Sequence, residues 1–220
     1  MTNKVYNQFI PNSTRNNCFE KIETEEQAYW LGFLYADGYV AYQDWNNQIE
    51  LTLQERDYHH LEKFRNFIGN KNVLQYRQKQ KAYRYSFKSK QIKENLISLG
   101  CTPRKSLTLT FPTKEQVPDN LLRHFIRGYV DGDGCLTVYS RKNSMRIEIL
   151  GTMEFLSGLQ KRCNLFQCRI YAKPPTKIYR IMLGKQTTVK IICDWLYKDA
   201  SIYLDRKYQK YYDYYYNAVQ

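Results

Sequence analysis

Apolar and polar positions recur along the chain with two periods, one typical of helices and one typical of strands. Thr24 begins a capping box with Gln27, and glutamates fill the first turn, so we expect a helix that ends at Asp37. Period-two alternation then predicts a hairpin over 39–42 and 48–53. The same two periods predict a helix over 59–68, a hairpin over 73–78 and 82–87, and a helix over 91–99 that Gly100 stops.

The second half of the chain repeats this order. A shift of 96 residues places Asp37 on Asp133, and the same shift places Tyr83 on Tyr179. We therefore interpret the chain as a duplicated α-β-β-α-β-β-α unit. In the second copy, Asp119 is expected to cap the helix that ends at Asp133. The remaining elements are expected as hairpins over 135–140 with 145–150 and over 167–171 with 177–183, and as helices over 155–163, 187–196 and 204–216.

This arrangement predicts two halves, residues 1–101 and 119–220, joined by a proline-containing linker over 102–118. The last helical stretch is rich in tyrosine, and its rings are expected to form a packing surface rather than a platform for stacked bases.

Two segments, 30–38 and 126–134, share one unusual pattern: an apolar helix that ends in an aspartate followed by glycine. Each carries small residues one turn apart, Gly32 with Ala36 and Gly128 with Gly132. Small residues at i and i+4 lie on one helix face and let another backbone approach, so we expect the two helices to pack together. The glycine after each aspartate is expected to stop its helix in the left-handed conformation.

An aspartate at the C-terminal end of a helix is unfavourable by roughly 0.3–1 kcal/mol, because that end of the helix dipole is negative. If the two helices pack in parallel, Asp37 and Asp133 arrive at the same end and repel each other. A hard divalent cation between them would remove both penalties. The alternative is that Asp-Gly is only a turn dipeptide, which two matched copies disfavour.

The formal charge of +13 and the pI near 9.4 favour a polyanionic partner. The excess is concentrated in 71–93, which holds no acidic residue and interleaves its basic side chains with aromatic ones. A basic run can be merely a solvated surface, but this alternation predicts strands that present basic groups, and nucleic acid is the expected partner.

The cysteines show no zinc-type spacing, and no secretory signal is recognised. We therefore expect a reduced, intracellular compartment: a bacterial or phage-infected cytoplasm, or an organelle. His59, His60 and His124 have no metal-ligand partner at a recognisable spacing and are expected at the surface or at an interface. No apolar run approaches the ~20 residues of a membrane span, so no membrane partner is expected.

The two motif segments, together with the linker phrase from Pro103 to Thr108, resemble the signature helices of the LAGLIDADG homing endonucleases in the single-chain, two-motif form. The resemblance implies an α+β protein with two pseudo-symmetric halves and the motif helices at the interface between them. It also implies saddle-shaped antiparallel sheets that lie along the DNA major groove. It implies that the last acidic residue of each motif, Asp37 and Asp133, binds Mg²⁺, with Mn²⁺ expected to substitute. The backbone carbonyls of Ala36 and Gly132 are the further ligands expected.

The first acidic position of the motif is Asp131 in the second copy but Tyr35 in the first, which departs from the family pattern. The resemblance also implies a catalytic basic residue after the third helix of each half. Lys105 matches in the first copy, and in the second copy Lys207 is the best match, with Arg206 as the open alternative. As candidates for ordering water we also name Asp57 and Glu154, each of which could equally be a helix-starting acid.

The expected activity is metal-dependent hydrolysis of one phosphodiester in each strand of a long, asymmetric duplex DNA target, by a monomer that acts in intron homing. Two other functions of the same scaffold stay open: an RNA-splicing maturase, whose partner would be RNA, and a DNA-binding protein that does not cleave. Outward-facing strand residues are expected to contact bases or phosphates, and the set is Gln43, Gln48, Glu50, Gln75, Arg77, Lys79, Lys81, Arg84, Arg141, Arg146, Glu148, Arg169, Lys173 and Arg180.

Overall fold

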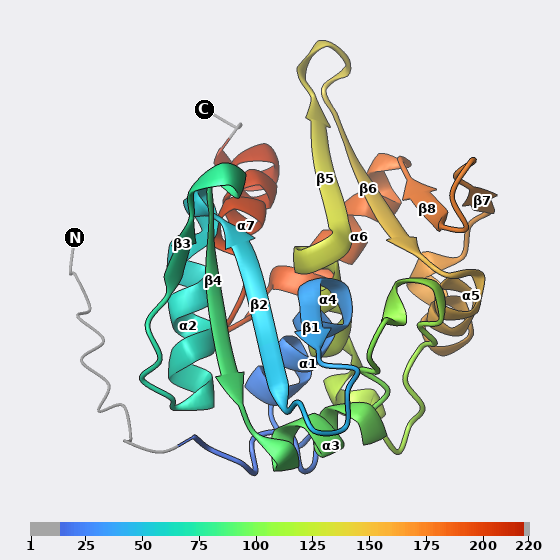
Figure 1. Ribbon diagram of the computed structural model, residues 1–220. Coiled ribbons are helices and arrows are strands. Elements are labelled where there is room, and N and C mark those ends of the chain that lie inside the picture. Colours follow the sequence, from blue (N-terminus) through green and yellow to red (C-terminus); the bar gives the residue numbers. More distant parts are fainter. Residues whose placement is uncertain (1–13, 218–220) are drawn as a thin grey trace.

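The computed structural model describes residues 14–217, which form two four-stranded antiparallel sheets on either side of a central pair of helices (Figure 1). The strand orders are β1-β2-β4-β3 and β5-β6-β8-β7, so the two sheets repeat one topology, as the duplication predicts. The first half comprises α1 (Glu25–Asp37), β1 (Gly38–Val40), β2 (Gln48–Gln54), α2 (Tyr58–Ile68), β3 (Gln75–Arg77), β4 (Ala82–Lys88) and α3 (Lys90–Ser98). The second half comprises α4 (Leu122–Asp133), β5 (Gly134–Tyr139), β6 (Ser144–Gly151), α5 (Met153–Arg162), β7 (Ile170–Ala172), β8 (Tyr179–Leu183) and α6 (Gln186–Tyr197), and α7 (Asp205–Tyr212) follows.

Local sequence signals account for the start of the first half. The Thr24 side chain accepts a hydrogen bond from the Gln27 N–H at 3.2 Å, and the Gln27 side chain accepts one from the Thr24 N–H at 3.0 Å. This is the predicted capping box. In β2 the apolar residues Ile49, Leu51 and Leu53 are buried, while the alternate residues face outward, as period-two alternation requires.

The predicted cap of α4 is wrong. A 3₁₀ turn, Asp119–Leu121, precedes α4, and no side chain caps that helix. The Asp119 carboxylate instead pairs with Lys114 at 2.8 Å and with Arg162 at 2.6 Å. An ion pair with α5 has displaced the local capping role that the sequence suggests.

The tyrosine-rich C-terminal segment forms α7 and one π turn, Asp213–Asn217. Tyr211 is buried, and its ring stacks on that of Tyr197 with 5.5 Å between centroids, in keeping with the predicted packing surface. The helix (red in Figure 1) contacts both halves, because Asp205 pairs with Lys63 of α2 at 2.7 Å and Lys210 donates to the Leu136 carbonyl of β5 at 2.9 Å. α7 therefore joins the second half to the first.

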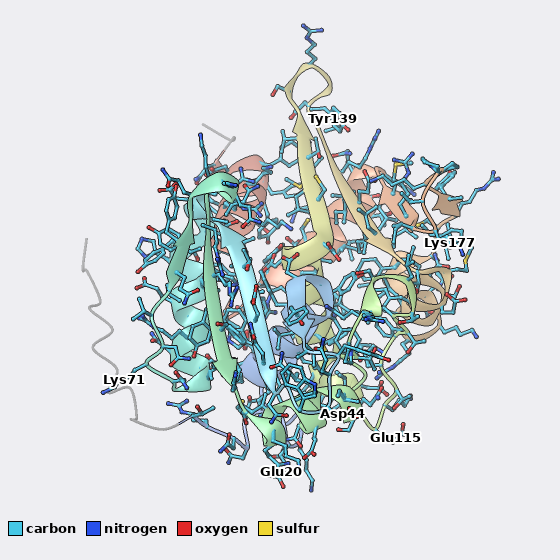
Figure 2. The ribbon with its side chains drawn as sticks, in the orientation of Figure 1. Glu20, Asp44, Lys71, Glu115, Tyr139 and Lys177 are labelled. Carbon is cyan, nitrogen blue, oxygen red and sulfur yellow. The ribbon has the colours of Figure 1, made fainter. Side chains whose placement is uncertain are left out.

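The β5–β6 hairpin projects beyond the rest of the molecule, with Tyr139 close to its tip (Figures 1 and 2). The six cysteines are free thiols. Among residues 14–217, no helix combines the length and the apolar character needed to cross a bilayer.

Candidate active site and nucleic-acid interface

The central helices α1 and α4 approach each other through their glycines. A β-carbon at Gly32 would lie 2.0 Å from the Phe125 carbonyl oxygen, and one at Gly128 would lie 2.0 Å from the Tyr29 carbonyl oxygen. One turn further on, a β-carbon at Gly132 would meet the β-carbon of Ala36 at 2.4 Å. The two helices pack together as the small residues predict, and the contacts advance in the same direction along both helices, so the helices are parallel.

Parallel packing brings Asp37 and Asp133 to the same end of the helix pair. A β-carbon at Gly132 would lie 3.3 Å from Oδ2 of Asp37, so the close approach of the helices brings this carboxylate up against α4. Neither carboxylate accepts a hydrogen bond or forms an ion pair with any residue in 14–217. The two acidic groups thus face one small region without a protein donor.

The pKa values of both site aspartates are raised, chiefly because nearby protein atoms displace water from the carboxylates. Both aspartates have exposed area, yet surrounding protein atoms remove enough water that desolvation raises the pKa of Asp37 to about 6, with the negative charge of Asp133 as the second cause. Desolvation also raises the pKa of Asp133, while Lys105 and Lys207 oppose that rise. A positive charge bound between the carboxylates would be favoured.

The glycines that follow the two aspartates are required for a different reason from the one predicted. Gly38 and Gly134 are in the extended conformation, with φ of −72° and −79°, and not in the left-handed region. A β-carbon at Gly38 would come within 2.6 Å of the Leu34 carbonyl oxygen, and one at Gly134 within 2.5 Å of the Val130 carbonyl oxygen. The chain leaves each helix too close to its last turn for any side chain.

A lysine from a distant segment reaches each of these exits. The Lys105 ammonium donates to the Gly38 carbonyl, and the Lys207 ammonium donates to the Gly134 carbonyl. Lys207 also donates to the Val130 and Asp131 carbonyls, at 2.7 Å each. The Val130 carbonyl also accepts from the Gly134 N–H, and Lys207 adds a positive charge to the carbonyls at the C-terminus of α4.

The adjacent basic residue has a different position. Arg206 Nε donates to both carboxylate oxygens of Asp57, at 2.9 and 3.1 Å, and Asp57 is buried. A pocket of about 210 Å³ is lined by Asp57 and Arg206 together with Asp37 and Asp131. Glu154, the counterpart of Asp57 in the second half, is exposed on α5 and does not line this pocket. Both carboxylate oxygens of Asp57 are thus bonded to Arg206, whereas the sequence suggested that Asp57 orders a water molecule.

A buried hydrogen-bond network, which sequence reasoning missed, surrounds Asp131. The Asp131 carboxylate accepts from the Tyr29 hydroxyl at 2.8 Å, the Tyr197 hydroxyl at 2.7 Å and the Leu204 N–H at 2.8 Å. Burial raises the pKa of Asp131. Tyr35, at the same motif position in the first half, donates its hydroxyl proton to the Leu99 carbonyl.

Histidines are placed in three different environments. His59 is exposed, and His124 lies beside Glu25 and Arg127, where the two halves meet, as the surface-or-interface prediction allows. His60 is instead buried, and its Nε2 lies 2.9 Å from the Tyr29 hydroxyl. Burial holds the pKa of His60 well below its usual value, so this ring is neutral.

The side chains at the helix ends could bind a hard divalent cation only together with other ligands, such as backbone carbonyls, water or phosphate. No group of three acidic, histidine or cysteine side chains that could hold a metal occurs among residues 14–217. Asp37 and Asp133 supply unpaired carboxylate oxygens, and the carbonyls of Ala36 and Gly132 lie in the same helix turns. Ions such as Mg²⁺ commonly take one or two carboxylates and complete their shell with water and substrate phosphate. The residues present fit such an ion.

The outward faces of the sheets carry many of the residues predicted to contact DNA. In the first sheet the register places Gln48, Glu50, Gln75, Arg77 and Arg84 on the face opposite the buried apolar residues. In the second sheet it places Arg146, Glu148 and Arg180 there. The other predicted residues lie in turns or beside strands, and they are Gln43, Lys79, Lys81, Arg141, Arg169 and Lys173.

Each sheet face contains one matched ion pair. Arg84 Nε lies 3.0 Å from Glu50 Oε2, and Arg180 Nη1 lies 3.3 Å from Glu148 Oε1. Several other outward residues were not predicted, because only charged and amide side chains were selected. The same alternation along each predicted strand identifies Tyr39, Thr52, Ser86, Cys135, Thr137 and Tyr139, and Gln54 lies one residue past the predicted end of its strand.

Solved structures with the same arrangement are LAGLIDADG homing endonucleases. I-LtrWI bound to target DNA aligns with a TM-score of 0.58 at 12% identity, over 87% of this chain and 89% of that one. I-SmaMI bound to cleaved DNA aligns with a TM-score of 0.55 at 13% identity, over 88% of each chain. I-SmaMI bound to an uncleaved DNA target in the presence of calcium ions aligns with a TM-score of 0.57 at 13% identity, over 87% of this chain and 89% of that one.

No protein-family model and no curated protein sequence matches this sequence. The fold is that of the LAGLIDADG homing endonucleases, with both motif helices in one chain, as the resemblance implied.

Proposed function

We propose that this protein is a site-specific endonuclease that hydrolyses one phosphodiester in each strand of duplex DNA. The proposal is carried by the meeting of Asp37 and Asp133 at the shared end of two parallel helices, where neither carboxylate accepts a hydrogen bond from any residue in 14–217. That point lies between two sheets whose outward faces are polar and rich in arginine. Structures with this fold are described as bound to target DNA and to cleaved DNA, which supports the same substrate class here.

The aspartates would hold a divalent metal, which we propose to be Mg²⁺, with the Ala36 and Gly132 carbonyls as further ligands. When bound, such an ion supplies a Lewis acid for the scissile phosphate and lowers the pKa of its water. I-SmaMI has been solved with calcium ions present, which supports a divalent ion in this fold.

The two lysines would contribute fixed positive charge beside the reacting phosphates. Desolvation lowers the pKa of Lys207 to about 8, so most of this group is still protonated at neutral pH. A buried cation held by backbone carbonyls needs little reorganisation to stabilise the charge that develops during phosphoryl transfer. Lys105 would serve the other strand, since its ammonium holds the equivalent carbonyl. Arg206 is the weaker choice, because Asp57 already holds its guanidinium.

DNA binding would use the two sheet faces, whose paired strands fit the major groove. The two copies carry different residues at equivalent outward positions, so the target is expected to be long and asymmetric. Both motifs lie in one chain, and we propose that a monomer suffices.

The direct test is a cleavage screen on randomised duplex DNA with Mg²⁺, using wild type, Asp37→Asn and Asp133→Asn. We expect the variants to bind the selected duplex but to make no double-strand break. Glu20→Gln is the matched control, because Glu20 is exposed and lies at the opposite end of the molecule from the projecting hairpin (Figure 2). A double Asp37→Asn, Asp133→Asn variant that still cuts would overturn the mechanism. RNA bound more tightly than duplex DNA, without cleavage, would favour a maturase.

A second comparison tests the basic residues. Lys105→Met and Lys207→Met should each slow cleavage with little loss of DNA affinity, while Arg206→Met should mainly lower stability, because it leaves buried Asp57 unpaired. Lys161→Met, an exposed change on α5, is the control for the loss of one positive charge. Wild-type cleavage by both site-lysine variants would remove the lysines from the mechanism.

A further inference from the structure

We propose that the residue two positions before each site aspartate, Tyr35 in α1 and Asp131 in α4, positions the lysine of its own half. The inference rests on the proposed endonuclease function, since it assigns to these two residues a positioning role in the proposed site. The carrying observation is that both side chains hold the segment that follows the third helix of their half, and each site lysine lies in that segment.

In the second half, Asp131 holds both ends of the connection from α6 to α7. Its Oδ1 accepts from the hydroxyl of Tyr197, the last residue of α6, at 2.7 Å. Its Oδ2 accepts from the N–H of Leu204, the residue before α7, at 2.8 Å. Asp131 is 1% exposed, so these bonds do not compete with water.

Fixing the start of α7 fixes Lys207. Lys207 lies in the first turn of α7, where its N–H donates to the Leu204 carbonyl at 2.9 Å. Its side chain returns to α4 and donates to the carbonyl of Asp131 itself, at 2.7 Å. Asp131 therefore acts on this segment through its carboxylate and through its backbone.

In the first half, Tyr35 holds the end of α3. Its hydroxyl donates to the carbonyl of Leu99, directly before the segment that leads to Lys105. Gly100 makes room for the ring, because a β-carbon there would lie 2.1 Å from the Tyr35 hydroxyl oxygen. The neighbouring Cys101 thiol, 3.6 Å from the Leu34 carbonyl, holds the same segment to α1. Lys105 then reaches Gly38.

The chemistry of the two contacts explains why the copies differ at this position. Leu99 offers a carbonyl oxygen, which needs a donor, and a tyrosine hydroxyl supplies one. Leu204 offers an N–H, which needs an acceptor, and a carboxylate supplies one. Each residue is thus matched to the polarity of the backbone group that its lysine segment presents.

The first test measures lysine accessibility without any cleavage. Lys105 is 9% exposed and Lys207 is 4% exposed, so both should react slowly with an amine-acetylating reagent, with the rates resolved by mass spectrometry. We expect Asp131→Asn to raise the acetylation rate of Lys207 several-fold and leave Lys105 unchanged. Tyr35→Phe should do the reverse. Equal increases at both lysines, or no increase at either, would overturn the inference.

The second test resolves the two DNA strands with separate labels. The strand that Lys207→Met slows should also be the one that Asp131→Asn slows, by roughly ten- to a hundred-fold, because misplacing a catalytic group costs up to about 10²-fold. Tyr35→Phe should slow the other strand. Tyr29→Phe is the matched control, because it removes another hydrogen bond to Asp131 without touching the α6–α7 connection; it should lower stability without strand bias.

The two tests separate the failure of this inference from the failure of the endonuclease proposal. If the wild-type protein cuts no duplex but the two variants change lysine acetylation selectively, the endonuclease proposal fails and the positioning inference stands. If the lysine variants slow one strand each but Asp131→Asn and Tyr35→Phe slow both strands alike, the positioning inference fails and the endonuclease proposal stands.

Discussion

Gly32 lies directly against Phe125, so close that a β-carbon at position 32 would come 2.0 Å from the Phe125 carbonyl oxygen. The contact is repeated by the equivalent pair, Gly128 and Tyr29, at the same distance. Both contacts oppose backbone to backbone, and neither neighbour is a flexible side chain that could move away. The spacing of the two aspartates therefore depends on helices that only glycine allows to approach.

We expect Gly32→Ala or Gly128→Ala to destabilise the protein by at least about 1–3 kcal/mol, the usual cost of overpacking a core. For a chain of this length, the melting temperature should fall by roughly 2–4 °C per kcal/mol. Gly184→Ala is the matched control, because no atom of the described residues lies within 4 Å of the β-carbon it would add. Equal melting temperatures for Gly32→Ala and the control would contradict the close approach.

The raised pKa of Asp37 predicts that the protein loses stability as pH rises and that a bound divalent metal restores it. The pKa is about 6 in the folded state and 3.8 in an unperturbed chain, so the folded state binds the proton more tightly. The free energy of unfolding should therefore fall as pH rises from about 4 to 6. In Asp37→Asn this decrease in the free energy of unfolding should be absent. The variant should therefore melt at a higher temperature than wild type at pH 7 without metal.

Thermal melts of wild type and Asp37→Asn at pH 4, 5, 6 and 7 test this expectation. Adding Mg²⁺ at pH 7 should raise the melting temperature of wild type and leave the variant nearly unchanged, because a ligand stabilises only the state that binds it. The same rise in both proteins would argue against a site at Asp37.

Arg127 should be essential for holding the two halves together. It is fully buried, and its guanidinium donates to the Ile202 and Leu196 carbonyls at 2.8 and 2.9 Å and to Glu25 at 2.6 Å. Arg127→Met should cost about 3–5 kcal/mol, because it leaves the partners of a buried ion pair without a donor. Glu25→Gln keeps an acceptor oxygen and should cost much less in chemical denaturation. A smaller loss for Arg127→Met than for Glu25→Gln would be the contrary result.

The ion pair on the first sheet predicts a gain in DNA affinity. Glu50 holds Arg84 at 3.0 Å and places a negative charge on a face that would meet phosphates. Glu50→Gln should tighten binding to duplex DNA of unrelated sequence and steepen the dependence of log affinity on log salt, because one more cation is free for phosphate. Fluorescence anisotropy at several salt concentrations, with Glu20→Gln as the control, measures both effects. An unchanged slope would place Arg84 away from phosphates.

Sequence alone predicted what depends on neighbours along the chain. Thr24 and Gln27 cap α1 as expected, because both partners lie within one turn. The role of Asp119 could not be predicted, since Arg162 of α5 takes the carboxylate that would have capped α4. The aspartates, the glycines on the helix face and the order of helices and hairpins followed from periodicity and duplication, and the sheet of each half followed from the resemblance to the LAGLIDADG homing endonucleases.

The parts that sequence left open depend on which way a side chain points. Arg206 and Lys207 are adjacent, yet one pairs with Asp57 and the other caps α4, because successive helix residues point about 100° apart. The bonds from Tyr197 and Leu204 to Asp131 join positions 66 and 73 residues apart. Only the packed structure brings such groups together.

The lysine that reaches each motif helix comes from beyond the third helix of its half, Lys105 to Gly38 and Lys207 to Gly134. The functional repeat in this chain therefore extends past the seven regular elements to include the segment after them. A separated first half that stops at residue 101 would lack its own lysine, whereas one extended past residue 107 would carry it. If the two halves are expressed from separate genes, the chain should therefore be divided after residue 107.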